Sequence, residues 1–470
     1  TEEVELAGTG WLAGGAMIYF PGRDDVIRRV YDNRQDHVFE YWQELNDAER
    51  MRLLDDLAEV DFVLMSRLFS GTEAAADTAF DPAPCIGLPK TAGEREEWER
   101  ARAAGEEHVR TGKVAAFVVA GGQGSRLGYE GPKGKFPVGP VSGKSLFQVH
   151  AEKVLKYSRK YGVDMPLLIM TSRANHEETE AFFRDNGRFG LAPENVLIFP
   201  QNMIPSIDTK GKLILETKSS VFKNPDGHGG SLTALFTSGA LAEMKKRGIE
   251  TISYFQVDNP LVKIVDPAFI GFHVLRNADV SSKAVKKAYP EEKVGVFVRF
   301  SSGAIGVVEY SDLPEEKTRS LDEKGELSYS SGSIAIHLFR REFIEKVTAG
   351  TDIALPFHTA RKKIKTLTGE TDGLKYEKFV FDALPLTEHN IVFETLREDE
   401  FAPVKNPSGI DSVDSARKMM SDQCRRWLAA GGVRVPEKTV TLEISPLAAV
   451  EPEDIDPALV VPERESVYIS

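Results

Sequence analysis

From about residue 114 onward, short apolar runs alternate with longer segments in which apolar residues recur at helical spacing. Continuous apolar runs are typical of strands that are buried on both faces of a sheet. Strands that alternate with amphipathic helices predict an α/β fold: a parallel sheet with helices on both faces and ligands at the carboxyl edge. The expected strands are Val114–Ala120, Leu167–Thr171, Asn195–Phe199 and Thr251–Val257, and the expected helices are Leu146–Lys160 and His176–Asp185.

The first 110 residues lack this alternation, and we expect them to be mainly helical. The stretch Tyr41–Phe69 repeats apolar side chains near helical spacing. Asn46 or Asp47 is expected to cap a helix within it, because short polar side chains accept from the free N–H groups of a helix start. A proline-rich connector over Asp81–Pro89 precedes a charged helix expected over Glu94–Arg110.

Two hairpins and a small C-terminal region complete the expected organisation. One hairpin turns at Lys210-Gly211 with Lys212–Glu216 as its second arm, and a larger one runs over Val294–Tyr310. Beyond residue 401, a helix over Val413–Ala429 leads to a β-rich tail that contains Val440–Ile444. We expect a helical N-terminal region over residues 1–110, a central α/β domain over 111–400 and a small C-terminal domain over 401–470.

The composition is that of an acidic globular chain, with 41% hydrophobic and 28% charged residues among 470. The net charge of −13 argues against generic binding to nucleic acid or to an anionic membrane. The acidic start lacks the basic segment of a signal peptide, and no apolar run reaches the ~18 residues of a membrane span. Two cysteines, Cys85 and Cys424, cannot form a disulfide framework, so we expect reduced thiols and a cytoplasmic location.

The first expected strand of the sheet ends in a glycine-rich loop that is followed by two cations. Gly121, Gly122 and Gly124 allow the backbone to turn tightly and to bring its N–H groups close to a ligand. Arg126 and Lys133 follow. A strand, a glycine loop and spaced cations form a cradle for a polyphosphate. The alternative interpretation is a glycine-rich surface turn with solvated cations.

Two common phosphate-binding loops do not fit this spacing. A dinucleotide-binding loop needs Gly-x-Gly-x-x-Gly, but after Gly122 and Gly124 the third position is Leu127, and Gly128 comes one residue late. A P-loop needs four residues before its Gly-Lys-Ser, and the stretch that starts at Gly139 has only three. What remains is Gly-Gly-x-Gly-x-Arg-Leu-Gly followed by Pro-Lys-Gly. That pattern resembles the signature of nucleotide-sugar pyrophosphorylases, which join a nucleoside triphosphate to a sugar 1-phosphate and release pyrophosphate.

A single carboxylate marks the end of the strand expected over Thr251–Val257. Asp258 terminates this strand and is followed by Asn-Pro. Because Mg²⁺ takes few protein ligands, one aspartate at a strand end can bind it together with substrate phosphates. The alternative interpretation is an ordinary turn-forming aspartate. On this feature alone, both interpretations stay open.

Several longer segments resemble the eukaryotic-type UDP-N-acetylglucosamine pyrophosphorylase family. Besides the glycine loop they are VDNPLVKIVDPAFIGF from Val257, VGVFVRF and VVEYSD between Val294 and Asp312, EKFVFD from Glu377, LREDEFAPVKN from Leu396 and LEISPL from Leu442. The resemblance spans most of the chain. It implies a Rossmann-like nucleotidyltransferase fold of the GT-A type: a mixed sheet flanked by helices, a helical N-terminal region, a central catalytic domain and a small β-rich C-terminal domain.

The resemblance also implies roles for individual residues. Phosphate-contacting catalytic roles fall on Arg126, Lys133 and Lys405, and the metal-binding role falls on Asp258. The nucleotide would lie against Gly121, Gly122, Gly124, Gln201, Gly227, His228 and Gly229, with the amide of Gln201 reading uracil. The sugar would contact Gly295, Glu309 and Ser333.

Two positions depart from the family pattern. His228 stands where the N-acetylglucosamine enzymes have asparagine, and Gly-His-Gly looks more like the UDP-glucose and broad UDP-sugar pyrophosphorylases. An imidazole simply packed within the loop is an equal alternative for His228. Ser333 stands where the family typically has an asparagine that faces the sugar, and its shorter hydroxyl leaves more room. The uridylyl half of the reaction is therefore better supported than the identity of the sugar.

These observations together predict a UTP:sugar-1-phosphate uridylyltransferase that uses Mg²⁺. Its expected product is UDP-N-acetylglucosamine or a related UDP-sugar, with UDP-glucose or a broad range of UDP-sugars as the alternative. A catalytically silent nucleotide-sugar sensor on the same fold and a transferase for a purine triphosphate are the alternatives of other kinds. The expected partners are UTP, a sugar 1-phosphate, the UDP-sugar and pyrophosphate. We expect a monomer or weak homo-oligomer that binds neither nucleic acid nor membranes.

Overall fold

The computed structural model describes residues 17–71, 79–349, 355–367 and 369–470. Contacts divide the chain into two compact units. The first unit comprises Thr1–Glu73, Ile204–Asn224 and Thr359–Tyr376, and the second comprises Ala74–Met203, Pro225–His358 and Glu377–Ser470. This division differs from the three parts expected from the sequence, because the second unit contains part of the N-terminal region as well as the whole C-terminal region.

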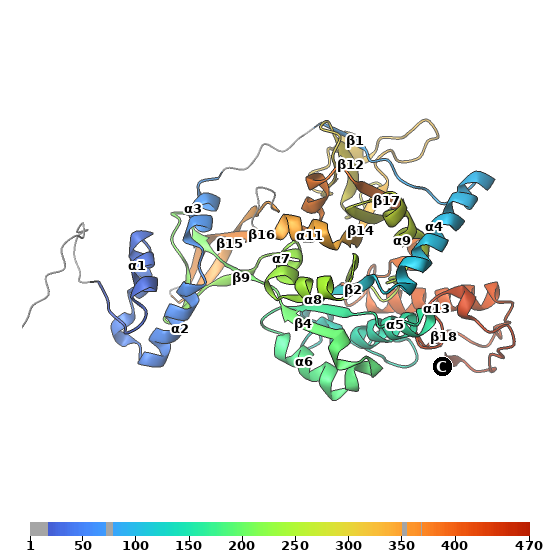
Figure 1. Cartoon of the computed structure of the whole chain (residues 1–470), viewed down its shortest axis with the longest axis horizontal. Coiled ribbons are helices and arrows are strands. Elements are labelled where there is room, and N and C mark those ends of the chain that lie inside the picture. The colour runs from blue at the N-terminus through green and yellow to red at the C-terminus, as the bar shows by residue number, and fades with distance from the viewer. Residues whose placement is uncertain (1–16, 72–78, 350–354, 368) are drawn as a thin grey trace, which may run out of the picture. The chain divides into compact units, whose positions relative to one another are not determined.

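The second unit is built on a ten-stranded mixed sheet (Figure 1). Its main path has the order β1-β12-β14-β10-β2-β3-β4; β11 pairs with β14 and β17, and β13 pairs with β12. Strands β10, β2, β3 and β4 are parallel, whereas β14 is antiparallel to β10. The strands are β1 (Phe80–Pro82), β2 (Val114–Val119), β3 (Leu167–Thr171), β4 (Val196–Pro200), β10 (Thr251–Gln256), β11 (Val280–Lys286), β12 (Val296–Phe300), β13 (Ile305–Val308), β14 (Ser331–Arg340) and β17 (Asn390–Glu394).

Helices cover both faces of this sheet, because successive side chains of each buried strand point to opposite sides. Val114, Ala116 and Val118 of β2 belong to one apolar cluster, and Ala115 and Phe117 belong to another. The first cluster includes residues of α4 (Ala92–Arg110), α5 (Leu146–Tyr161), α6 (His176–Asp185) and α9 (Pro267–Leu275). The second includes residues of α7 (Gly230–Thr237), α8 (Ala240–Lys246) and α11 (Arg341–Thr348). The expected α/β fold is confirmed.

The bounds of several elements follow directly from local sequence signals. Helix α5 begins after Ser145, whose side chain accepts from the N–H of Gln148 at 3.1 Å. It ends at Gly162, which adopts the left-handed conformation with φ 68°. The larger expected hairpin is also present, since β12 and β13 pair antiparallel around a turn at residues 301–304.

The C-terminal part of the second unit packs onto the chain that follows the glycine loop. It contains α12 (Arg397–Glu400), α13 (Val413–Ala430) and a parallel pair formed by β18 (Thr441–Ile444) and β19 (Ser466–Ile469). Glu443 of β18 is buried and accepts from the N–H groups of Val141 and Ser142 at 2.8 and 2.7 Å. It also accepts from the Ser142 hydroxyl at 2.6 Å. A carboxylate with three such donors fixes the loop between Gly139 and Lys144.

The first unit contains α1 (Asp24–Asp32), α2 (Asp47–Ala58) and α3 (Phe62–Phe69), together with β6 (Ile207–Asp208), β7 (Leu215–Thr217) and β8 (Ser220–Val221). It also holds nearly all of β15 (His358–Thr366) and β16 (Gly369–Glu377), while β5 (Met203–Pro205) and β9 (Lys223–Pro225) lie at the junctions between the units. The expected Asn46 cap is present, because its side chain accepts from the N–H of Glu49 at 3.0 Å. The apolar stretch that follows breaks into two helices, because Asp61 caps α3 by accepting from the N–H of Leu64 at 2.9 Å.

The second arm of the smaller hairpin does not form as expected. Asp208 accepts from the N–H of Lys212 at 2.9 Å, which closes the turn, but only a single bridge joins Ile207 to Leu213. The chain then leaves this partner, and Leu215 pairs with Val221 instead. The arm predicted over residues 212–216 is therefore shorter than expected: it extends to Ile214, whose N–H donates to the carbonyl of Ser206 at 3.2 Å, and Leu215 begins the next pairing.

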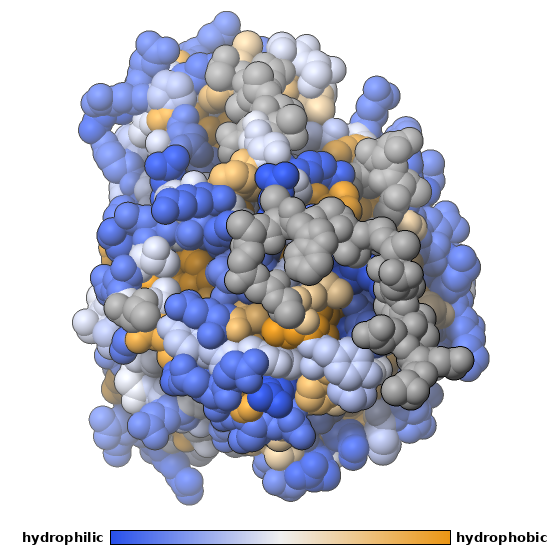
Figure 2. Space-filling model, turned by 90° about the vertical axis from the view of Figure 1, so that its left-hand side faces the viewer, coloured by the Kyte–Doolittle hydropathy of each residue, from blue (hydrophilic) through white to orange (hydrophobic). Residues whose placement is uncertain are grey.

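The surface is rich in polar residues, as expected from a chain with 28% charged residues. The face drawn in Figure 2 is mostly hydrophilic, and its apolar residues form scattered patches. In the described part of the chain, no helix combines the length and apolar character needed to cross a membrane.

Candidate active site

The carboxyl edge of the parallel strands gathers residues from distant parts of the sequence. Strands β4, β3, β2 and β10 are neighbours in this order and run in the same direction. Gly121 follows β2, Gln201 follows β4 and Asp258 follows β10. The glycine loop and the carboxylate expected to bind metal therefore leave adjacent strands at one edge of the sheet.

The glycine loop is held by backbone hydrogen bonds and by one buried amide. The N–H of Gly124 donates to the carbonyl of Gly131 at 2.9 Å, and that of Lys133 donates to Gly122 at 3.0 Å. Asn175 is fully buried and donates to the carbonyl oxygens of Ala120 and Gly122 at 3.1 and 3.3 Å. These bonds fix the loop from behind. Among described residues, the N–H groups of Gly121 and Gly122 have no acceptor, so they can hold an anion.

A close ion pair joins Lys133 to Asp258. The ammonium nitrogen of Lys133 lies 2.7 Å from Oδ2 of Asp258, and both side chains keep some exposure, at 16% and 18%. The backbone carbonyl of Asp258 accepts from the N–H of Val404 at 2.8 Å. Lys405 is the next residue; it is exposed, with its ammonium 5.7 Å from the centre of the Phe401 ring. Lys133, Asp258 and the backbone that carries Lys405 therefore meet at one place.

The two remaining residues of this edge differ in burial. Gln201 is buried, and its backbone N–H donates to the carbonyl of Thr171 at 2.7 Å. Its side-chain amide lies against Gly121, where an added Cβ would come within 3.3 Å of Oε1. Arg126 is exposed on the short turn that follows Gly124. The amide of Gln201 is thus beside the glycine loop, and the side chain of Arg126 is open to solvent.

The loop from Gly227 to Gly229 packs tightly against the chain at Lys378 and Phe379. An added Cβ at Gly227 would lie 2.4 Å from the carbonyl oxygen of Lys378, and one at Gly229 would lie 2.6 Å from the carbonyl carbon of Phe379. The N–H of Gly229 donates to the same Lys378 oxygen at 2.9 Å. These glycines are therefore required by protein packing, in addition to the nucleotide contact that the resemblance implies.

The ring of His228 is held by the same segment. It stacks on Phe379 with centroids 5.3 Å apart, and its Nδ1 accepts from the N–H of Val380 at 3.1 Å. Burial lowers the pKa of His228 to about 4, so the imidazole is neutral at pH 7. This arrangement is the one considered in the sequence analysis as an alternative, in which the imidazole is packed within the loop.

Asp226, just before this loop, is a residue that the sequence analysis did not single out. Its carboxylate is buried, and one of its oxygens, Oδ1, has no partner among the described residues. An added Cβ at Gly230 would lie 1.9 Å from that oxygen, so the carboxylate sits against the first turn of α7. Burial raises the pKa of Asp226 to about 6, and the nearby ammonium of Lys378 opposes the rise.

The three residues expected to contact the sugar lie together. Because β14 is antiparallel to β10, its first residues extend past the edge at which β10 ends. The N–H of Ser333 in β14 donates to the carbonyl of Gly295 at 2.8 Å. A Cβ added at Gly295 would lie 3.7 Å from a carboxylate oxygen of Glu309. Burial, and then the carboxylates of Asp312 and Asp382, raise the pKa of Glu309.

Comparison with known proteins identifies the family. The family model for UTP–glucose-1-phosphate uridylyltransferase matches residues 90–434. The chain belongs to this family. UDP-N-acetylglucosamine diphosphorylase 2 of Arabidopsis thaliana is 37% identical over 457 residues, which cover 92% of this chain and 90% of the relative. Human UDP-N-acetylhexosamine pyrophosphorylase-like protein 1 is 36% identical over 440 residues, which cover 87% and 86%. The resemblance found in the sequence motifs is confirmed.

Solved structures share the fold. The UDP-N-acetylglucosamine pyrophosphorylase of Trypanosoma brucei, in complex with an inhibitor, aligns with a TM-score of 0.84 at 28% identity. The alignment covers 97% of this chain and 99% of that one. A UDP-glucose phosphorylase of the same organism aligns at 17% identity with a TM-score of 0.61, covers 80% of each chain and supports the fold alone. The expected nucleotidyltransferase fold is confirmed.

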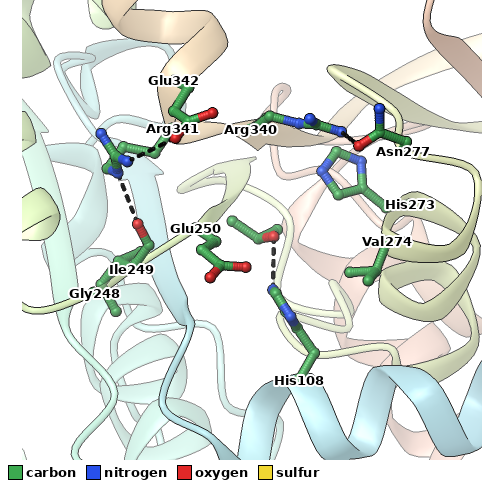
Figure 3. A pocket seen from close by; sticks show the side chains of 11 residues that line it. His108, Gly248, Ile249, Glu250, His273, Val274, Asn277, Arg340, Arg341 and Glu342 are labelled. Carbon is green, nitrogen blue, oxygen red and sulfur yellow. Dashed lines mark hydrogen bonds and ion pairs between the residues drawn. The ribbon is translucent and has the colours of Figure 1, made fainter.

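A separate pocket of about 310 Å³ lies at the opposite edge of the uridylyltransferase sheet (Figure 3). Thr251, the first residue of β10, and Arg340, the last residue of β14, are among its lining residues. Arg340 donates to Oδ1 of Asn277 at 2.7 Å, and Arg341 donates to the carbonyl of Ile249 at 2.9 Å. Both guanidinium groups therefore already have acceptors in the protein.

Proposed function

We propose that this uridylyltransferase joins UTP to N-acetylglucosamine 1-phosphate, forming UDP-N-acetylglucosamine and pyrophosphate. The observation that carries the proposal is the Lys133–Asp258 pair, 2.7 Å apart, beside a glycine loop in which the N–H groups of Gly121 and Gly122 have no acceptor among the described residues. The Arabidopsis relative and the trypanosome structure, both named for UDP-N-acetylglucosamine, support the choice of sugar. The two free cysteines support a reducing compartment, the cytoplasm, as its location.

The reaction needs positioning and charge neutralisation, and no covalent intermediate on the protein. An oxygen of the sugar phosphate attacks the α-phosphorus of UTP in line, the bond from that phosphorus to the bridging oxygen breaks, and pyrophosphate leaves with the electron pair. The N–H groups of Gly121 and Gly122 hold phosphate oxygens. Lys133, Lys405 and Arg126 lower the repulsion between the two anions. Because one phosphoanhydride replaces another, the reaction is readily reversible.

Asp258 is the residue that fits a magnesium ion. Among the described residues there is no group of three or more histidine, cysteine, aspartate or glutamate side chains that could hold a metal. Mg²⁺ commonly binds one or two carboxylates and takes its other ligands from substrate phosphates and water. A bound Mg²⁺ would supply positive charge to the phosphates. Asp258, partly exposed at the end of β10, would hold it there.

The choice of sugar is assigned to Gly295, Glu309 and Ser333. Glu309 would accept from sugar hydroxyls. Packing within the hairpin requires glycine at position 295, because an added Cβ would meet Val307 at 2.6 Å. The short side chain of Ser333 and the presence of His228 favour a second candidate, a UDP-glucose or broad UDP-sugar pyrophosphorylase. Both candidates use the same uridylyl chemistry.

A panel of sugar 1-phosphates with UTP tests the proposal. We expect pyrophosphate release with N-acetylglucosamine 1-phosphate to exceed that with glucose or galactose 1-phosphate, and to stop when a chelator removes Mg²⁺. Ser333→Asn should shift the ratio of kcat/KM further toward the N-acetylated sugar. A preference for glucose 1-phosphate would favour the second candidate. Binding of UDP-sugars without turnover of any sugar 1-phosphate would favour the alternative of a catalytically silent sensor.

A further inference from the structure

Asn259, the residue after Asp258, joins the turn that follows β10 to the segment that leads to Lys405. It is 3% exposed. Its Nδ2 donates to the carbonyl of Glu400 at 2.6 Å, and its Oδ1 accepts from the N–H of Ala402 at 3.1 Å. A carboxamide is the side chain that both donates and accepts in this way. Asn259 thereby substitutes for a strand partner along a segment more than a hundred residues away in sequence.

The segment that Asn259 holds leads directly to Lys405. The side chain of Glu400, at its start, is fully buried between the Lys283 ammonium and the Thr395 hydroxyl, which donates at 2.7 Å. Near its other end, the N–H of Val404 donates to the carbonyl of Asp258 at 2.8 Å. The backbone before Lys405 is thus fixed at residues 400, 402 and 404. At all three residues a backbone group is bonded to the Asp258–Asn259 turn.

We propose that Asn259 is a positioning residue that sets the distance of Lys405 from Asp258 and Lys133. This inference rests on the proposed function, which assigns Lys405 to a substrate phosphate. Catalysis here depends on placing charges around a phosphoryl group, and a displacement of about 1 Å can cost about 100-fold in rate. The side chain of Asn259 is buried against backbone groups, so its effect on turnover is expected to pass through Lys405.

A double-mutant cycle tests this route. Asn259→Ala in the otherwise native chain should lower kcat about 100-fold and leave the KM for UTP within about twofold. In a Lys405→Met background, the same change should lower kcat by less than about threefold, because the group that it displaces is already absent. Asn259→Asp keeps the side-chain volume and the acceptor for Ala402 but loses the donor to Glu400. If the alanine variant folds poorly, Asn259→Asp replaces it in the cycle and should show the same loss of kcat.

Asn390→Ala is the matched control. Asn390 also donates to two backbone carbonyls, those of Leu384 and Thr387, at 2.7 and 2.8 Å. Its replacement should lower the thermal midpoint of unfolding comparably while leaving kcat within about twofold.

Multiplicative losses in the Asn259–Lys405 cycle would overturn the inference, and so would a Lys405→Met variant with native kcat. A fall in kcat for Asn390→Ala as large as that for Asn259→Ala would also overturn it, because the effect would then be general destabilisation. A wild-type chain that releases no pyrophosphate from UTP with any sugar phosphate would remove the proposed function along with it. Independent losses in an active enzyme would remove the inference alone.

Discussion

Relative to the wild type, Asp226→Asn should gain stability as the pH rises from acidic to neutral. The carboxylate is 4% exposed, and its Oδ1 has no partner among the described residues. Burial raises its pKa from 3.8 to about 6. At pH values between 3.8 and about 6, the native state therefore keeps a proton that the unfolded chain has already released. The stability that Asp226 contributes is complete below about pH 4 and is lost as pH rises through about 6.

The magnitude follows from the size of the shift. A difference of about two pH units at about 1.4 kcal/mol per unit gives about 3 kcal/mol. Asparagine has nearly the same shape and cannot ionise, so it avoids this cost at neutral pH. The free energy of unfolding of Asp226→Asn, minus that of the wild type, should accordingly rise by about 3 kcal/mol between pH 4 and pH 7.

Denaturant unfolding of both proteins at a series of pH values measures this difference. Asp185→Asn is the control, because Asp185 lies on the surface with a side chain that is 65% exposed. Its difference from the wild type should stay constant across the series. A constant difference for Asp226→Asn would refute the reasoning, and a difference that falls toward neutral pH would mean that Lys378 stabilises the charged carboxylate more than burial destabilises it.

Three further substitutions test other parts of the site. Lys133→Met removes a charge next to the phosphates and should lower kcat by about 100-fold or more, measured as pyrophosphate release. Gln201→Ala should reduce the preference for UTP over CTP by about tenfold, measured in competition, because a base-reading amide is lost. Gly229→Ala should lower the free energy of unfolding by about 1–3 kcal/mol, because its Cβ would lie 2.6 Å from the Phe379 backbone.

Each of these substitutions has its own control or contrary result. Lys135→Met removes a cation from the same loop, one that pairs with Glu178 at 2.6 Å, and should keep most of the activity. Equal losses for both lysines would argue against a special role for Lys133. Gly93→Ala adds a Cβ where no atom lies within 4 Å and should be tolerated. An unchanged choice of base in Gln201→Ala would assign uracil recognition to another residue.

The regular elements of the sheet were predictable because their signals are local. The expected bounds of β3 and α6 are those of the structure, since an uninterrupted apolar run and a helical repeat each lie between clear breaks. The break at Asp61 within the N-terminal helices was not foreseen, although an aspartate before an apolar run is a cap signal. The arm expected over residues 212–216 ends early, after Ile214, because the sequence does not say which strand an apolar residue will pair with.

The sequence indicated which residues to consider for the candidate site, but it did not indicate which of them contact one another. Family motifs pointed to Lys133 and Asp258, yet nothing in their spacing of 125 positions predicts a 2.7 Å ion pair. Asn175, Asp226 and Glu443 carried no signal, because each acts on residues that are distant in sequence or works through burial. Such roles depend on tertiary packing and become visible only when the chain is folded.

The Lys133–Asp258 pair allows both side chains to be held before substrate arrives without blocking either proposed role. Lys133 bonds to Oδ2, and in the described part of the chain the other oxygen, Oδ1, has no partner. A carboxylate with one oxygen bonded to an ammonium still offers the second to a metal ion. The ammonium likewise keeps two further N–H groups for phosphate oxygens. One ion pair thus lowers the entropy cost of ordering two flexible groups while leaving the binding capacity of each available.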